Sequence, residues 1–266
     1  MKGFYLAAAL LLCIGLFSCN RDEGDIPALD EEMMEAPLKP LKRFDRYDNG
    51  LRYSRVINYD AQNRIESIEL TQYHGAAAPR YNKISVDYTD DQISTILDET
   101  SRGINQPVNE SITYALFYEN NKIRLLSQET GIDILHANGF IDEVLEYRVE
   151  NSVVYRHTDL IRDSLQNLTS VSWNGGGVIN RYSNFDSGKK PDQDGFVIDI
   201  AQRKYFILFG LKVSANNPRT SAQTIGNSTN PESRYTYEYD EEGYIIRTYN
   251  GDVNDRWYAD TFYKEE

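Results

Sequence analysis

The chain has 266 residues, with 28 Lys and Arg against 41 Asp and Glu, which gives a net charge of −13 at pH 7. Binding to nucleic acid or to anionic lipid needs clustered Lys and Arg, so this balance argues against both partners. Both cysteines, Cys13 and Cys19, lie near the N-terminus, so the remaining chain offers no disulfide, thiol nucleophile or thiolate metal site. The 20 tyrosines against two tryptophans favour pleated, half-exposed surfaces and indicate β-sheet.

Residues 1–18 are predicted to be a signal peptide. Lys2 supplies the positive charge, and Phe4 to Phe17 form an almost unbroken apolar run that is too short to span a bilayer comfortably. The segment Leu16-Phe17-Ser18-Cys19 resembles a bacterial lipobox, although Phe17 is larger than the usual residue there. We therefore predict that Cys19 carries acyl chains such as palmitate, which would anchor the protein to a membrane without spanning it.

Residues 19–40 are acidic, contain proline and lack apolar periodicity, so they are predicted to be a disordered tether. Residues 41–266 are long enough for one domain. In Lys83–Tyr88, apolar and polar residues alternate, and the same pattern returns in Ile112–Tyr118 and Tyr235–Tyr239. A period of two is the signature of a half-buried antiparallel strand.

One short phrase recurs along these strands. A strand ends in an aromatic residue and an acid, a polar turn follows, and the next strand begins with an apolar residue. Clear copies begin at Tyr59, Tyr88, Tyr118 and Tyr239, and weaker copies begin at His136 and Asp163. Recurrence of one unit predicts hairpins joined end to end. The expected fold is all-β, an antiparallel up-and-down meander that closes into a barrel-like or strongly curved sheet.

Strand Ile65–Tyr73 mixes Glu66 and Gln72 with apolar residues on one face and carries Glu69 on the other. A membrane-spanning barrel needs a continuous apolar outer band, so insertion of these strands into lipid is not expected.

Two stretches depart from the strand pattern. Residues 192–211 fit a helical face, although Tyr205–Phe209 also fits a strand buried on both faces; one helix near 192–210 is preferred. Ser214–Ser233 is polar and contains Pro218 and Pro231, so it is predicted to be a long loop.

The repeated phrase at Tyr59 and Tyr239 resembles the YD repeats of large bacterial shell-forming proteins. The whole mature chain resembles a family of uncharacterised lipoproteins common in Bacteroidota, described as a domain of unknown function with a porin-like fold. The residues that carry this resemblance are the signal with Cys19, the hairpin phrases, and the segments Leu211–Pro218 and Tyr235–Tyr244.

The acidic Asn20–Glu23 resembles the export tag of surface-exposed lipoproteins in those bacteria. The resemblance implies a lipid-anchored outer-membrane protein with a barrel-like sheet. Because the family has no assigned activity, the resemblance implies no catalytic residue and no cofactor.

Candidate chemical groups are few. The three histidines, His74, His136 and His157, have no spacing that suggests paired metal ligands, so each is expected to have a surface or packing role. Carboxylate pairs for glycoside hydrolysis are easily proposed, namely Asp142 with Glu143 or Glu238 with Asp240. Turns and outward strand faces account for them better, because carboxylates are well solvated there.

Asp192, Asp194 and Gly195 echo part of a calcium loop, but the third acid and the closing Glu are absent. Lys189 and Lys190 would also oppose a cation, so an ordinary turn is preferred and no metal is expected.

Three aromatic residues, Trp173, Trp257 and Tyr258, can be imagined as a platform for sugar rings. Cross-strand packing that staples the sheet is the preferred alternative.

The sequence therefore predicts a non-enzymatic, surface-exposed envelope lipoprotein that acts as a binding or structural module. Its partner would be a glycan, a peptide or an envelope protein, and its only membrane contact would be the lipid anchor. The runner-up is a hydrolase acting on envelope or extracellular glycan, and a third possibility is a passive barrel filled by its own side chains.

Overall fold

The computed structural model describes residues 39–48, 50–73, 77–186, 203–251 and 257–264. The chain divides into two compact units, Met1–Leu38 and Lys39–Glu266, and all elements below belong to the second. The strands are β1 Leu41–Asp48, β2 Leu51–Tyr59, β3 Ile65–Gln72, β4 Arg80–Thr89, β5 Gln92–Ser101, β6 Val108–Glu119, β7 Lys122–Leu126, β8 Thr130–Ala137, β9 Phe140–Arg148, β10 Val154–Arg162, β11 Leu168–Trp173, β12 Val178–Phe185, β13 Pro218–Ile225, β14 Ser228–Thr229, β15 Ser233–Tyr239, β16 Ile245–Asn250 and β17 Trp257–Tyr263. The helical segments are α2 Arg203–Phe206 and the 3-10 turn η2 Ile207–Phe209.

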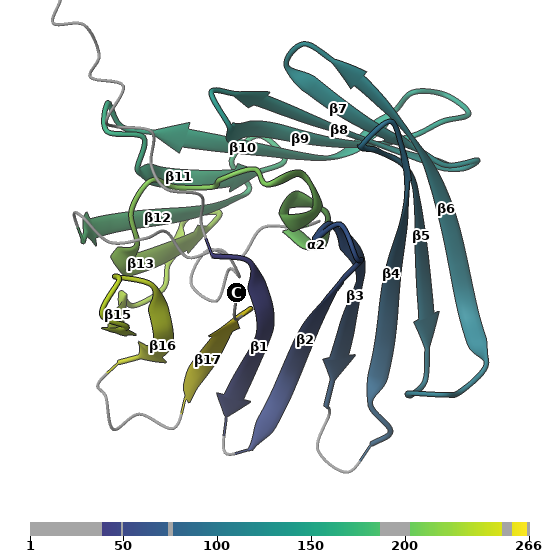
Figure 1. Ribbon diagram of the computed structural model, residues 1–266. Coiled ribbons are helices and arrows are strands. Elements are labelled where there is room, and N and C mark those ends of the chain that lie inside the picture. The colour runs from purple at the N-terminus through teal and green to yellow at the C-terminus, as the bar shows by residue number, and fades with distance from the viewer. Residues whose placement is uncertain (1–38, 49, 74–76, 187–202, 252–256, 265–266) are drawn as a thin grey trace, which may run out of the picture. The chain divides into compact units, whose positions relative to one another are not determined.

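The sheet is an antiparallel meander that closes on itself. Each strand pairs with the next in sequence, and β13 pairs with β15 across the short β14. The last strand, β17, pairs with β1 from Leu41↔Tyr263 to Asp48↔Trp257, and the two lie side by side in Figure 1. The result is a 16-strand barrel with almost no helix, which confirms the predicted fold class. Closure leaves the ring without an edge strand.

All copies of the repeated phrase lie at one end of the barrel, which we call the tyrosine rim. Connections in a meander alternate between the two ends, and the copies occupy the turns β2–β3, β4–β5, β6–β7, β8–β9, β10–β11 and β15–β16. The ladder shifts by one residue where most of these strands end, for example between Asn58 and Tyr59 and between Asp87 and Tyr88. Such a bulge turns the strand end without interrupting the sheet.

The acid of the phrase builds the turn. In three copies the Asp carboxylate accepts the backbone N–H groups two and four residues later, at 2.8–3.0 Å; the acids are Asp60, Asp163 and Asp240. The residue three positions after each acid has positive φ, and these residues are Asn63 (65°), Gln166 (63°) and Gly243 (87°). Asn and Gly tolerate that conformation best, which explains the polar turn sequences.

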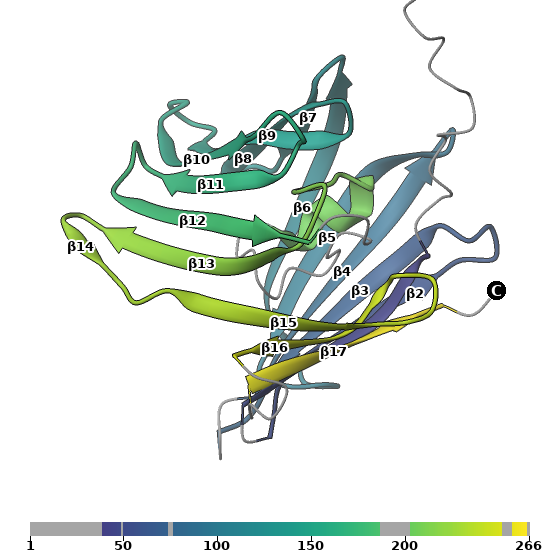
Figure 2. The ribbon, with the colours of Figure 1, turned by 90° about the vertical axis from the view of Figure 1, so that its left-hand side faces the viewer.

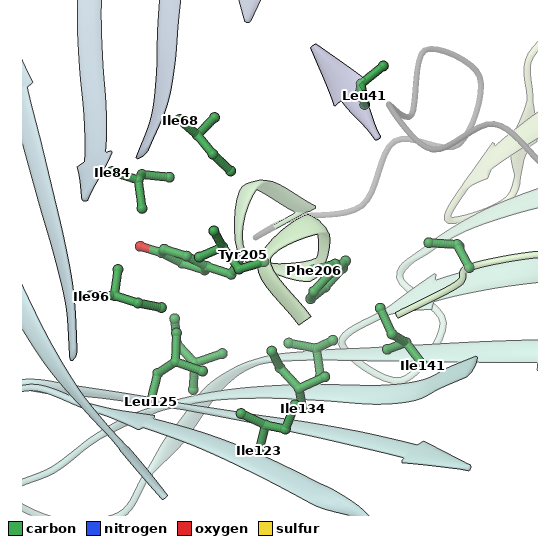
Figure 3. Packing of buried hydrophobic residues seen from close by; sticks show 14 of the residues in the cluster. Leu41, Ile68, Ile84, Ile96, Ile123, Leu125, Ile134, Ile141, Tyr205 and Phe206 are labelled. Atoms are coloured by element: carbon green, nitrogen blue, oxygen red, sulfur yellow. The ribbon is translucent and has the colours of Figure 1, made fainter. Parts of the chain in front are cut away.

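Alternation along the strands fills the barrel with apolar side chains. The segment α2–η2 lies inside the barrel, where Tyr205 and Phe206 are each 1% exposed (Figure 1). Figure 3 shows the inward isoleucines and leucines of the wall surrounding these two rings. Residues 203–209 are therefore helical, as preferred from sequence, and the strand alternative for Tyr205–Phe209 is wrong. The rest of the predicted helix lies outside the described residues.

The predicted loop over Ser214–Ser233 is wrong. Figure 2 shows this stretch as β13, β14 and the approach to β15. The strand Pro218–Ile225 pairs with β12 from Val178↔Ile225 to Phe185↔Pro218. Its Ser and Thr residues put small polar groups on both faces, so the strand has no alternation of apolar and polar residues to reveal it.

Candidate functional site

The outer wall of the barrel is charged. Side chains alternate across a strand, so residues next to the inward core residues point outward. Outward ion pairs join Arg43 to Asp45 and Arg124 to Asp133, both at 2.8 Å, and Arg247 to Asp260. A further row across β3, β4 and β5 places Lys83 opposite both Glu69 and Glu99. This is the reverse of a lipid-facing wall, whose outward side chains are apolar.

Asp98 on β5 is a buried acid of the barrel interior, 6% exposed; Glu146 on β9 is another, 3% exposed and paired with Arg156 at 3.0 Å. One carboxylate oxygen of Asp98 accepts the amide of Asn82 at 2.5 Å, and the other contacts Lys204 Nζ at 2.5 Å and accepts the hydroxyl of Tyr205. Desolvation and the neighbouring Asp98 raise the pKa of Tyr205, so its hydroxyl stays a donor. Since both oxygens are engaged within the protein, this cluster attaches α2 to the wall.

The three aromatic residues proposed as a platform do not come together. Trp173 is half-buried and packs against the core cluster from the inner face. Trp257 faces Asp48 across the ladder, and the guanidinium of Arg46 lies 4.6 Å from its ring. Trp257 shares a strand face with the buried Ala259 and so points inward. Tyr258, the next residue in the strand, therefore points outward. Trp173 and Trp257 thus lie on the inner face of the wall and Tyr258 on the outer face.

Tyr258 belongs to an aromatic cluster on the outer wall of β1, β16 and β17, the Tyr258 patch. Its ring stacks on Tyr47 with centroids 4.7 Å apart and planes at 17°, and it lies 6.1 Å from the ring of Tyr249. The guanidinium of Arg247 lies 5.0 Å above the Tyr258 ring, and Tyr249 donates a hydrogen bond to Glu238 at 2.9 Å. Desolvation raises the pKa of both Tyr47 and Tyr249. The patch combines aromatic faces with a charged rim.

The carboxylates considered for hydrolysis each have a structural partner. Asp142 contacts Arg162 at 2.8 Å, and Glu143 contacts His157 at 2.5 Å. Asp240 builds its turn as described above. A cavity of about 350 Å³ at the end opposite the tyrosine rim is lined by Arg80, Arg102 and Glu110 among others. Among the described residues that line it, Glu110 is the only carboxylate, so they do not offer the carboxylate pair that glycoside hydrolysis needs.

The remaining predicted positions are distributed as follows. His136 lies at the tyrosine rim, paired with Ile141, and His157 lies on the outer wall beside two carboxylates. Cys19, His74, Asp192 and Asp194 lie outside the described residues. Sequence spacing missed the environment of His157, because one of its neighbours comes from another strand. The local signal was His157 and Asp159, two residues apart and therefore on one face of a strand.

No helix within the described part of the chain is long and apolar enough to cross a bilayer.

Comparison with known proteins finds resemblance in structure alone. No protein-family model matches the chain, and no curated protein matches it. A porin-like protein from Bacteroides uniformis ATCC 8492 aligns with a TM-score of 0.55 and 10% identity, over 86% of this chain and 99% of that chain. A porin-like protein from Bacteroides vulgatus ATCC 8482 aligns with a TM-score of 0.46 and 12% identity, over 85% and 99%. At such identity, the first alignment shows that the two proteins share a barrel fold.

Proposed function

We propose that this protein is a lipid-anchored barrel exposed at the surface of the outer membrane, where it serves as a binding or structural module and not as an enzyme. The observation that carries the proposal is the polarity of the barrel. Its wall carries ion pairs such as Arg124–Asp133 on the outside, while Ile96 and Leu125 on the inside are fully buried. Burying these outward charges in hydrocarbon would cost several kcal/mol, roughly 2–4 for each Arg or Lys at the midplane.

A barrel with a charged wall needs an attachment outside its strands, and the lipobox at Leu16–Cys19 supplies one. The membrane would then be contacted through the lipid alone. The net charge of −13 disfavours nucleic acid as a partner.

Metabolic labelling with a fatty acid tests the anchor. Label should enter the wild-type protein and not Cys19→Ser. In a second arm, residues 1–19 are replaced by a cleavable secretory signal without a lipobox. The exported chain should then be soluble and leave the membranes in an alkaline wash. Equal labelling of the wild type and Cys19→Ser would contradict the lipid anchor. Retention of the chain with the replaced signal in washed membranes would contradict a barrel that is not inserted. Protease digestion of intact cells tests surface exposure.

For the binding role, the Tyr258 patch has the right chemistry for a glycan. The edges and hydroxyl groups of Tyr47 and Tyr258 can contact a sugar ring, and the surrounding Arg247 and Glu238 can hydrogen-bond to its hydroxyl groups. Tyr258→Ala should lower binding to isolated cell-wall polysaccharide at least tenfold. Phe117→Ala removes a 50% exposed aromatic elsewhere on the outer wall and serves as the matched control. Equal binding by both variants would reject the patch as the site.

A further inference from the structure

One histidine and two carboxylates meet on the outward faces of β9 and β10. His157 Nε2 lies 2.5 Å from Glu143 Oε1 and 2.9 Å from Asp159 Oδ1. One donor atom from each of the three residues lies within 4.8 Å of the others. We propose that Glu143, His157 and Asp159 form a binding site for a divalent transition-metal ion of the zinc class.

The charges around the three residues favour a cation. Glu143 and Asp159 are directly opposite each other across the β9–β10 ladder, and like charges at such positions are destabilising. Their other cross-strand neighbours, Leu135 and Ser172, are uncharged. Other outward acids lie beside a basic residue, as Asp133 lies beside Arg124 and Glu69 beside Lys83. Here a histidine takes that place. A metal-bound imidazole is neutral, so the two carboxylates would supply two negative charges for an M²⁺ ion to neutralise.

The donor set also suits the metal class. An imidazole nitrogen with carboxylate oxygens is typical of Zn²⁺ and its neighbours in the first transition row, whereas Ca²⁺ and Mg²⁺ prefer oxygen ligands alone. His157 Nε2 is shielded from solvent and touches both carboxylates, yet forms a hydrogen bond with neither. No hydrogen bond within the described residues therefore competes with a metal for this nitrogen.

The geometry requires only a small adjustment. Bonds of about 2.1 Å at tetrahedral angles put ligand atoms roughly 3.4 Å apart, so His157 Nε2 must move away from each carboxylate oxygen by less than about 1 Å. They are 29–40% exposed and have the space to do so.

Neighbouring groups already orient two of the ligands. Ser172 Oγ donates to the other oxygen of Asp159 at 3.3 Å. The backbone of His157 is bonded on both sides to Asn174, with N–H to Oδ1 at 3.1 Å and C=O from N–H at 2.8 Å. Such second contacts commonly hold metal ligands in place, and their loss costs affinity.

Three protein ligands leave a fourth position open toward solvent. A tetrahedral ion with three protein donors binds water there, or a donor from another molecule. The site would therefore join β9 to β10 and offer a place on the wall where an outside ligand can coordinate.

The test uses the full chain in detergent, without a polyhistidine tag, after treatment with a chelator. Titration with ZnCl₂ followed by calorimetry should show one equivalent bound per chain. Co²⁺ in its place should give the intense visible absorption of a four-coordinate ion. His157→Ala should lower zinc affinity at least tenfold and abolish the Co²⁺ band, and Glu143→Gln or Asp159→Asn should each weaken binding.

His136→Ala is the matched control, because this second described histidine pairs with the inward Ile141 and so lies on the opposite face of the wall from Glu143. This variant should bind zinc as the wild type does. Thermal unfolding checks that every variant is folded; zinc should raise the Tm of the wild type and His136→Ala but not that of His157→Ala. The proposal is overturned if the wild type binds no zinc at about 100 μM, because a dissociation constant weaker than this would not count as specific binding. Zinc binding that survives His157→Ala also overturns it.

Discussion

The tyrosine that begins a copy of the repeated phrase joins two strands by its hydroxyl group. Tyr59, Tyr88 and Tyr118 donate to the carbonyls of Leu41, Ile65 and Ile93, at 2.7, 2.9 and 2.9 Å. In each case the acceptor is at or beside the start of the preceding strand. Tyr263 repeats the contact with Ile245 at 2.9 Å. The phrase thus specifies a contact across the sheet as well as a turn.

Removing these hydroxyl groups measures their contribution. Tyr59→Phe and Tyr118→Phe should each lower the free energy of unfolding by about 1 kcal/mol, since the ring stays in place and one hydrogen bond to a backbone carbonyl is lost. Urea unfolding is the measurement. Tyr47→Phe is the control, because the Tyr47 ring stacks on Tyr258 and its hydroxyl bonds to none of the described residues. An unchanged midpoint in both rim variants would contradict the assigned role.

Alkaline pH tests the same tyrosines without mutation. Desolvation raises the pKa of Tyr59 to about 12, and likewise that of Tyr118, from an ordinary value near 10. The unfolded chain therefore releases these protons first, and the free energy of unfolding should fall as pH rises from about 10 to about 12. Unfolding curves at several pH values should show this loss. The fall of the free energy of unfolding with pH should be shallower in a Tyr59→Phe/Tyr118→Phe double variant. An identical slope would show that these two tyrosines do not cause the loss.

Among the elements, hairpins were the most predictable, because turn chemistry is local. Asp90-Asp91 has positive φ at both residues, as does Asn138-Gly139, and such turns match the twist of the strands they join. The strand Pro218–Ile225 could not be recognised, because its neighbours in the ring make it a strand and its own residues show no period. The helix at 203–209 was recognisable by spacing, but its position inside the barrel depends on Asp98, which lies more than a hundred residues away.

Glycine has a defined purpose in one strand. Gly131 on β8 is paired with Tyr147 on β9, and a Cβ at Gly131 would overlap the tyrosine ring. The ring lies across the glycine, and its hydroxyl donates to Asp133 at 3.2 Å. An aromatic side chain that covers a glycine in the facing strand compensates for the missing side chain.

Gly131→Ala should therefore lower the free energy of unfolding by roughly 1–3 kcal/mol, because the Tyr147 ring must leave its position. In a Tyr147→Ala background the same change should cost much less. A double-mutant cycle measured by guanidinium unfolding separates the two contributions. Additive effects of the two changes would show that the ring contact is not the cause.

For the molecule as a whole, the sequence predicted the strands but left open whether the sheet closes. Closure depends on the pairing of β1 with β17, more than 200 residues apart, and no local pattern encodes such a contact. The His157 cluster illustrates the same limit, because Glu143 is placed opposite Asp159 only by the register of two strands. The polarity of the wall was visible earlier, in the charged residues of strand Ile65–Tyr73.

Introducing a charged residue on each face of the wall tests this polarity. Phe117 is half-exposed on the outer wall opposite Arg124, so Phe117→Glu should change the free energy of unfolding by no more than about 0.5 kcal/mol. Ile96 is fully buried inside, and Ile96→Glu should prevent folding or cost several kcal/mol. Thermal unfolding and the yield of soluble protein are the measurements. If Phe117→Glu were as damaging as Ile96→Glu, the outer wall would not be in water.

Closure of the strands into a ring has one more consequence. The N–H of Lys264 donates to the carbonyl of Pro40 at 2.8 Å, so the two ends of the described barrel meet at the tyrosine rim. A short peptide could bridge them, and the chain could be opened at a hairpin instead. The barrel is then specified by a cyclic order of strands, and circular permutation would leave every neighbour in that order unchanged.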